Sequence, residues 1–238
     1  MGNEMEGMVK EKLNIYYLLD VSASMSGSRI QQLNACMQSL KALLEDEGID
    51  NNVDIVIRAI QFGGDVKWHT GSAAEGVAIE NFMWTDLSAT GNCTPTSEAI
   101  RMLADSITPE YLGKRALRPV AILVTDGACT DSSSEYSAAC TRIAGKIKGN
   151  LTRIAIGVEN ANKSELEEFA SIGQIGENLN TPFVFKVENA EEMTKLIHWA
   201  SLVSISSSLV SKGETGKGLE GGSAPVIPDE PEDGEIWI

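Results

Sequence analysis

Oxygen-bearing side chains cluster where a short apolar segment ends. The segment LNIYYLL (13–19) is followed directly by Asp20, and Ser22 and Ser24 come at alternate positions after it. A loop that leaves a strand can turn such residues toward one point, and hard divalent cations prefer oxygen ligands. Asp and Ser before a helix also serve ordinary capping, so this motif alone leaves both interpretations open.

Two later segments place further oxygen ligands in similar loops. GNCTPTSEAI puts Thr94 before a predicted helix, and ILVTDGACTD puts Asp126 directly after a second apolar segment. Thr96 is a competing candidate, with capping of the helix after Pro95 as its alternative role. Ligands of open parallel sheets bind at the carboxyl ends of the strands, so we expect Asp20 and Asp126 at the same crevice.

Strand and helix patterns alternate along the chain and must position these loops. The predicted strands share a short, mostly apolar run, and they are 13–19, 53–62, 119–125, 151–158 and 181–187, with 65–70 as an antiparallel edge strand. The predicted helices share apolar residues spaced by three and four, and they are 29–47, the segment after Pro95, 136–147 and 193–203. The alternation predicts a three-layer α/β fold with a mostly parallel central sheet and helices on both faces.

Length and composition indicate one folded domain with two appendages. The 238 residues are 42% hydrophobic and 22% charged, which is typical of a globular chain. We expect an N-terminal extension (1–12), a domain (13–210) and a flexible acidic tail (211–238). The tail is expected to be a solvated charge run, with two alternatives left open. Its carboxylates could occupy the metal site, and its end, Ile-Trp-Ile (236–238), could be a linear interaction motif.

Charge and hydropathy exclude two classes of partner. The formal net charge of −15 repels nucleic acid. No stretch approaches the roughly 18 apolar residues of a membrane span, and the first residues lack a secretory signal pattern. The four cysteines, Cys36, Cys93, Cys129 and Cys140, show no C-x-x-C pairing and are expected to be reduced thiols. These features predict a cytoplasmic protein.

The sequence resembles the von Willebrand factor A (VWA) domain family. The resemblance lies in the motif D-x-S-x-S, a later Thr and the motif T-D-G, which occur in this order within the alternating strands and helices. The resemblance covers about residues 13–205. It implies a metal-ion-dependent adhesion site (MIDAS) whose metal residues are Asp20, Ser22, Ser24, Thr94 and Asp126. It also implies a bound Mg²⁺, with Mn²⁺ as an alternative, and an open position for a partner's carboxylate. One departure from many relatives is Gly91-Asn92-Cys93 in place of Gly-Gly, and Asn92 is expected to tolerate a left-handed conformation.

Within the family, the chain is most similar to compact bacterial proteins associated with tellurite resistance and stress response. The similarity lies in NIYYLLDVSASMSGSRI (14–30), ILVTDGACTD (122–131) and HWASLVSISSSLV (198–210). It implies a protein kinase and a metal-dependent serine/threonine phosphatase as partners. The serines of SISSSLV (204–210) are either a frayed, solvated helix end or phosphate acceptors.

The predicted function is therefore a non-catalytic, metal-dependent protein-interaction module. A haloacid-dehalogenase-type phosphatase is the enzymatic alternative, with Asp20 as nucleophile. Its motif requires a second carboxylate two residues later, where this chain has Ser22, and no P-loop motif occurs either. A structural scaffold, in which the ion only stiffens the loops, is the third class.

Overall fold

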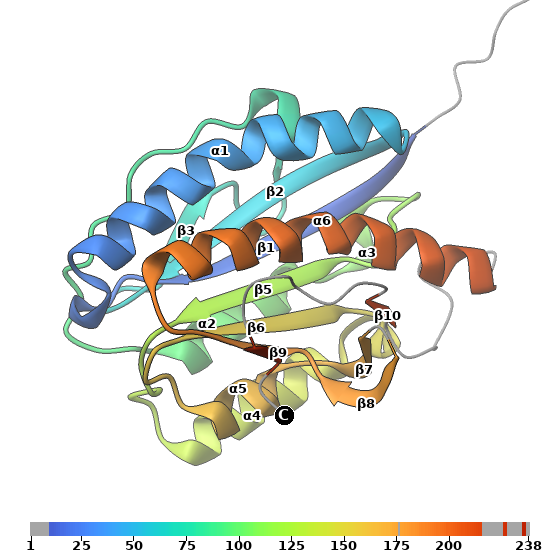
Figure 1. Cartoon of the computed structure of the whole chain (residues 1–238). Helices are drawn as coiled ribbons and strands as arrows, with labels where there is room; N and C mark the ends of the chain where they lie inside the picture. The colour runs from blue at the N-terminus through green and yellow to red at the C-terminus, as the bar shows by residue number, and fades with distance from the viewer. Residues whose placement is uncertain (1–9, 176, 216–225, 228–234, 237–238) are drawn as a thin grey trace, which may run out of the picture.

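The computed structural model describes residues 10–175, 177–215, 226–227 and 235–236. It confirms the predicted three-layer α/β architecture (Figure 1). The strands of the main sheet are β1 (Glu11–Asp20), β2 (Val53–Phe62), β3 (Lys67–Thr70), β4 (Val77–Ala78), β5 (Val120–Thr125), β6 (Thr152–Val158), β9 (Val184–Val187) and β11 (Glu235–Ile236). A smaller sheet is formed by β7 (Ile172–Ile175), β8 (Asn178–Pro182) and β10 (Val226–Ile227).

The main sheet is parallel at its centre and antiparallel at its edges. Its order is β11-β9-β6-β5-β1-β2-β3, with β4 also paired to β2. β1 runs parallel to both β2 and β5, whereas β3, β4 and β11 run antiparallel to their neighbours. The chain moves outward from β1 to β2 and later returns to the other side of β1 as β5. The carboxyl ends of β1 and β5 therefore form a topological switch point, where α/β sheets commonly bind ligands.

Helices cover both faces of this sheet (Figure 1). The α-helices are α1 (Ser28–Asp50), α2 (Thr96–Ser106), α3 (Pro109–Leu112), α4 (Ser133–Ala144), α5 (Lys163–Phe169) and α6 (Ala190–Thr215). Short 3₁₀ turns are η1 (Ala23–Met25), η2 (Ile79–Asn81) and η3 (Lys146–Gly149). α1 and α6 pack on one face, and α2, α4 and α5 pack on the other.

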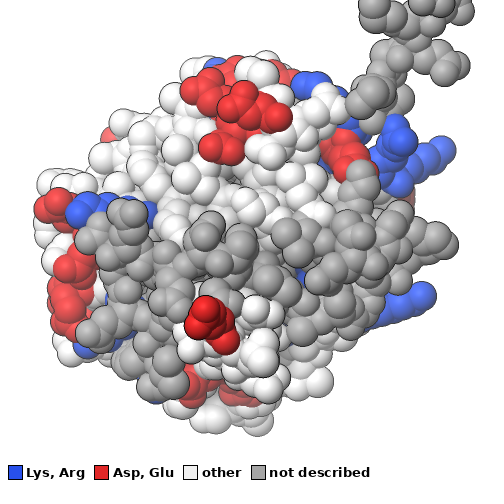
Figure 2. Space-filling model, turned by 45° about the vertical axis from the view of Figure 1, so that its right-hand side comes forward, with Lys and Arg blue, Asp and Glu red and all other residues white. Residues whose placement is uncertain are grey.

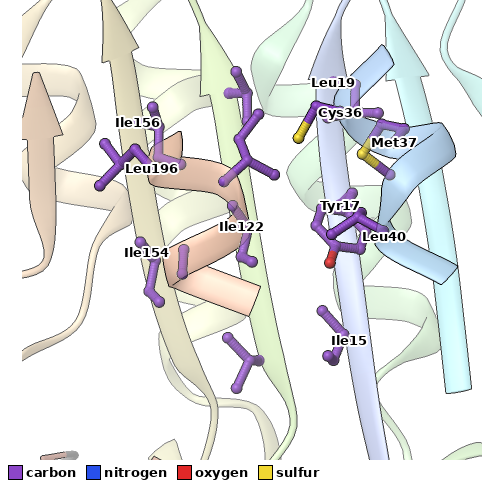
Figure 3. Close-up of a cluster of buried hydrophobic side chains, with 14 of the residues drawn as sticks. Ile15, Tyr17, Leu19, Cys36, Met37, Leu40, Ile122, Ile154, Ile156 and Leu196 are labelled. Carbon is purple, nitrogen blue, oxygen red and sulfur yellow. The ribbon is translucent and has the colours of Figure 1, made fainter. Parts of the chain in front are cut away.

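Strand β1 contributes to both halves of the core because its side chains alternate between faces. Ile15, Tyr17 and Leu19 face α1 and α6, and Figure 3 shows them beside residues of α1. The Tyr17 hydroxyl lies 2.7 Å from Ser201 Oγ of α6. Tyr16 and Leu18 face α2 and α4. All five are buried on this central strand. Fully burying an aliphatic side chain such as Ile15 or Leu18 contributes about 1.5–3 kcal/mol, so both helical layers are held firmly to the strand that carries the candidate site.

The serines of α6 are packed against the sheet. Ser204 and Ser208 are 1% exposed, and their hydroxyls donate hydrogen bonds to Ala200 O and Arg118 O. Only Ser206 of this group is exposed. The interpretation of this segment as a frayed, solvated helix end is therefore wrong, because the small serine side chains let α6 pack closely on the strands.

Two predicted elements have different bounds in the structure. The predicted strand 181–187 is divided, because Asn178–Pro182 pairs with β7 and only Val184–Val187 joins the main sheet. The helix predicted over 136–147 ends at Ala144, since Ile147 adopts a positive φ of 43° within η3. The first difference arises from strand pairing and the second from a turn of the backbone, and the spacing of apolar residues encodes neither.

Parts of the predicted flexible tail form secondary structure. α6 continues to Thr215, Val226–Ile227 pairs with β7, and Glu235–Ile236 pairs with the edge strand β9. The rest of the tail, including Trp237 and Ile238, lies outside the described residues, as does most of the N-terminal extension. The two alternatives for the tail, occupation of the metal site and an Ile-Trp-Ile motif, remain predictions.

Two surface properties bear on possible partners. Among the described residues, no helix is long and apolar enough to cross a membrane. On the face shown in Figure 2, the visible Lys and Arg side chains form small, separate groups beside groups of Asp and Glu.

Candidate metal centre

Asp20 is the last residue of β1, and its side chain is fixed on both sides. Its Oδ1 accepts a hydrogen bond from the Ser22 backbone N–H at 2.8 Å, and its Oδ2 accepts one from the Thr125 hydroxyl at 2.6 Å. The residue is fully buried, and this burial raises the pKa of the carboxyl group while the hydrogen bonds oppose the rise. The Asp20 carboxylate is therefore a preorganised acceptor at the carboxyl end of the central strand.

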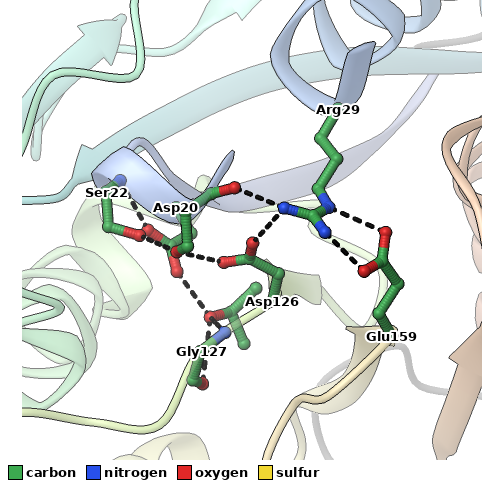
Figure 4. Close-up of polar contacts among 8 residues, drawn as sticks. Asp20, Ser22, Arg29, Asp126, Gly127 and Glu159 are labelled. Atoms are coloured by element: carbon green, nitrogen blue, oxygen red, sulfur yellow. Dashed lines mark hydrogen bonds and ion pairs between the residues drawn. The ribbon is translucent and has the colours of Figure 1, made fainter. Parts of the chain in front are cut away.

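A chain of polar contacts joins the β1–α1 loop to the β5–α4 loop. The hydroxyls of Ser22 and Ser24 lie 2.9 Å apart, and Ser24 Oγ donates to Asp126 Oδ1 at 2.7 Å (Figure 4). Ser22 and Asp126 are buried, whereas Ser24 is exposed. The structure thus brings four of the five predicted metal residues into one hydrogen-bonded group with a solvent-facing side at Ser24.

The fifth residue, Thr94, faces the same space from the loop before α2. A Cβ placed on Gly127 would lie 3.6 Å from Thr94 Oγ1 and 4.0 Å from Ser24 Oγ. Both hydroxyls therefore border a volume that any side chain at Gly127 would enter. The backbone of Thr94 is anchored to the loop that carries Asp126, since Thr94 N donates to Thr130 Oγ1 at 3.0 Å.

The structure distinguishes Thr94 from its competitor Thr96. The Thr96 hydroxyl donates to Thr94 O at 3.3 Å, whereas the Thr94 hydroxyl borders the space at Gly127. The expected capping role of Thr96 is wrong, because Pro95 occupies the N-cap position of α2. Asn92 does not adopt the left-handed conformation that it was expected to tolerate, because its φ is not positive.

The donor set fits a hard divalent cation. The described residues contain no group of three or more His, Cys, Asp or Glu side chains that could hold a metal. A cation at this edge would therefore be held by hydroxyls together with the two carboxylates. All of these donors are oxygens, as Mg²⁺ and Mn²⁺ prefer.

Three further residues shape the site, and sequence reasoning did not select them. Thr125 fixes Asp20, while Arg29 in the first turn of α1 donates to Asp126 Oδ2 at 3.2 Å. Arg29 also pairs with Glu159, which follows β6. Thr125 directly precedes Asp126 in the T-D-G motif, so this motif is a sequence signal that could have identified it. Nothing in the local sequence connects Arg29 with a residue 130 positions away.

The two cysteines nearest these loops are free thiols in the structure. Cys129 Sγ lies 3.3 Å from Asp131 Oδ2, and burial raises the pKa of this thiol. Cys93 Sγ lies 4.0 Å from Gly64 O. A raised pKa keeps the Cys129 thiol protonated, which makes it a weak nucleophile.

The fold and the cluster together define a doubly wound α/β domain with an oxygen-lined candidate site at the switch point of its sheet. The family model of the von Willebrand factor type A domain matches residues 14–199. This segment covers most of the chain and contains all five predicted metal residues. The chain therefore belongs to the VWA family.

Solved structures of low sequence identity share the fold. A von Willebrand factor type A protein from Catenulispora acidiphila has a TM-score of 0.59 at 15% identity, covering 83% of this chain and 43% of that one. Proximal thread matrix protein 1 from the mussel byssus, with a zinc-occupied MIDAS motif, has a TM-score of 0.55 at 19% identity, with coverages of 82% and 48%. The pilus adhesin SpaC from Lactobacillus rhamnosus GG has a TM-score of 0.61 at 11% identity, with coverages of 84% and 31%. The chain thus spans less than half the length of each of these proteins.

Proposed function

We propose that this protein is a non-catalytic interaction module that recognises a partner's acidic side chain through a divalent cation. The proposed metal residues are Asp20, Ser22, Ser24, Thr94 and Asp126. The observation that carries the proposal is the continuous polar chain from Asp20 to Asp126, with the Thr94 hydroxyl facing the same space. Metal-binding MIDAS sites are known in the family, and the zinc-occupied motif of the mussel protein is one such case.

The burial of the site residues determines the side from which an outside ligand can approach. Asp20 is buried at the base, while Ser24 is exposed, so an outside ligand reaches the site from the Ser24 side. A bound Mg²⁺ or Mn²⁺ supplies a positive centre that can accept one more oxygen ligand. The carboxylates of Asp20 and Asp126 formally balance the charge of the ion, but Arg29 adds a positive charge beside Asp126, which favours an incoming Asp or Glu over a neutral group.

The Asp20 contacts argue against the phosphatase alternative. A carboxylate nucleophile must be reached by the phosphorus atom of a substrate, whereas a small cation can be held at a buried carboxylate directly or through water. Both oxygens of Asp20 accept hydrogen bonds, and the residue is fully buried. The neighbouring position that would supply a general acid holds the Ser22 hydroxyl, which contacts Ser24. Incubation with a generic aryl phosphate and Mg²⁺ should release no phosphate above the rate without protein.

The proposed setting is a bacterial stress-response or tellurite-resistance system in the cytoplasm. A protein kinase and a metal-dependent serine/threonine phosphatase are the proposed partners. The support is the similarity of the first strand and loop, the TDG segment and the serine-rich helix. Since Ser204 and Ser208 are buried, we propose that a kinase partner docks on this protein without phosphorylating these two serines in the folded state.

Calorimetric titration with MnCl₂ and MgCl₂ tests the metal site. We expect the parent protein to bind one cation and a Ser22→Ala, Ser24→Ala double variant to lose the binding. Ser26→Ala is the matched control, because Ser26 is an exposed serine in the same loop. Absence of cation binding in the parent, or equal binding in the double variant, would contradict the proposed site.

Partner binding separates an interaction module from a scaffold. Binding of the purified kinase or phosphatase should be lost in EDTA and in the Ser22→Ala, Ser24→Ala variant. If cations raise the melting temperature and partner affinity nevertheless stays unchanged in EDTA, the scaffold interpretation is correct.

A further inference from the structure

Arg29 joins three loops at the carboxyl edge of the sheet. Its Nη1 donates to Asp126 Oδ2 at 3.2 Å and to the backbone oxygen of Ser24. Its Nε donates to Glu159 Oε1 at 2.9 Å, and its Nη2 pairs with the other oxygen of the same carboxylate (Figure 4). The guanidinium therefore contacts the β1–α1 loop, the β5–α4 loop and the segment after β6 at once.

Glu159 pairs with Arg29 from a strained backbone conformation. It has a φ of 52°, in the left-handed region that side chains other than Gly rarely adopt. Its backbone N–H donates to Val187 O at 2.7 Å, which fixes the turn after β6. The bidentate pairing orients the Arg29 guanidinium and is stronger than a single contact. Glu159 is thus placed to restrain Arg29.

The contacts make Asp126 a shared carboxylate. Its Oδ1 accepts from Ser24, and its Oδ2 accepts from Arg29, while its side chain is only 3% exposed. A cation that uses Asp126 must therefore act on a carboxylate whose charge Arg29 already balances in part. Arg29 in turn divides its own charge between Asp126 and Glu159.

We propose that Arg29, restrained by Glu159, is a built-in counter-cation for Asp126 that lowers the divalent-cation affinity of the site. This inference rests on the proposed function. Loss of Arg29 removes a positive charge that competes for Asp126. Loss of Glu159 leaves the whole charge of Arg29 to Asp126. The two substitutions therefore change cation affinity in opposite directions, and Glu159 acts through Arg29.

Calorimetric titration of the full chain with MnCl₂ at physiological salt tests this coupling. Removal of one nearby competing charge by Arg29→Met should tighten the dissociation constant about tenfold. Glu159→Gln should weaken it about threefold or more, and in the Arg29→Met background it should change it by less than about twofold. Arg142→Met is the control for net charge, because Arg142 is a partly exposed arginine near the end of α4, and it should bind as the parent does.

Several results would overturn the inference. Weaker binding in both single variants would show that the ion pair only supports the loops, and additive effects in the double variant would show that Glu159 does not act through Arg29. Melting curves without cation identify any variant that does not fold, and Arg29→Gln then replaces Arg29→Met. If the parent binds Mn²⁺ and the effects of the Arg29 and Glu159 substitutions on affinity are independent, only this inference fails and the proposed function stands. If no variant binds a cation, the proposed function fails with it.

Discussion

Gly91 lies against the backbone of Gly63. A Cβ placed on Gly91 would be 1.1 Å from Gly63 O, so no side chain fits between these two loops. Gly91 N donates to Val21 O at 3.1 Å, and Gly91 O accepts from Ala23 N at 2.8 Å. The two hydrogen bonds keep the loop that carries Thr94 beside the loop that carries Ser22, and the contact with Gly63 leaves no room for a side chain at their junction. The glycine is required here by contact, since Gly91 has no positive φ.

Gly91→Ala is expected to destabilise the domain by about 1–3 kcal/mol, because the added methyl group forces the two loops apart. It should also weaken cation binding by separating Thr94 from Ser22. Gly145→Ala is the control, since a Cβ there makes only ordinary contacts at 3.7 and 3.8 Å. Urea unfolding and calorimetry measure the two effects. Equal stability of the two variants would contradict the close contact.

Thr125 is predicted to position the Asp20 carboxylate. Its hydroxyl donates to Asp20 Oδ2 and accepts from Gly127 N at 3.2 Å. Thr125→Val keeps the shape and removes the hydroxyl, which should cost about 1–3 kcal/mol and weaken cation binding. Thr125→Ser keeps the hydroxyl and should retain most of the cation affinity. If the valine and serine variants bind cation equally, the hydroxyl has no positioning role.

The serines of α6 should respond very differently to an introduced charge. Ser204→Glu places a carboxylate in the core and should destabilise the protein by about 4 kcal/mol or more. Ser206→Glu, two positions away on the exposed side, should change stability by about 0.5 kcal/mol or less. Thermal and urea unfolding of both variants measure the difference. Tolerance of Ser204→Glu would mean that this part of α6 is not packed on the sheet.

Arg58 is a buried cation that holds the segment after β3. It is 2% exposed, and it donates to Asn14 Oδ1 at 2.8 Å and to the backbone oxygens of Ser72, Ala74 and Tyr111. Among the described residues it forms no ion pair with a carboxylate. Burial lowers the pKa of its guanidinium, but these acceptors satisfy its donors.

Arg58→Lys should therefore destabilise the protein by about 2–4 kcal/mol, since an ammonium group cannot reach the same acceptors. Amide hydrogen exchange should quicken between Ser72 and Ala78. Arg142→Lys, at a partly exposed arginine, should have little effect on stability or exchange. Unchanged exchange in the Arg58→Lys variant would show that other contacts hold this segment.

The sequence by itself determined the layered fold and most of the candidate site. Apolar runs located β1, β2, β5 and β6 because each is buried on both faces, and β2 has the predicted bounds. Asp20 and Asp126 were expected at one crevice because the order of strands in an α/β sheet brings the carboxyl ends of β1 and β5 together. Ser22, Ser24 and Thr94 were added by the resemblance of the sequence motifs to the VWA family. These features depend on local pattern and on chain topology.

Only the tertiary structure decided the contacts between distant segments. The pairing of Arg29 with Glu159 depends on the packing of α1 beside the end of β6, and the burial of Ser204 depends on how α6 lies on the sheet. Likewise, the division of 181–187 and the pairing of Glu235–Ile236 with β9 are set by available strand edges. Such contacts form between groups far apart in the chain, so no local spacing of residue types records them.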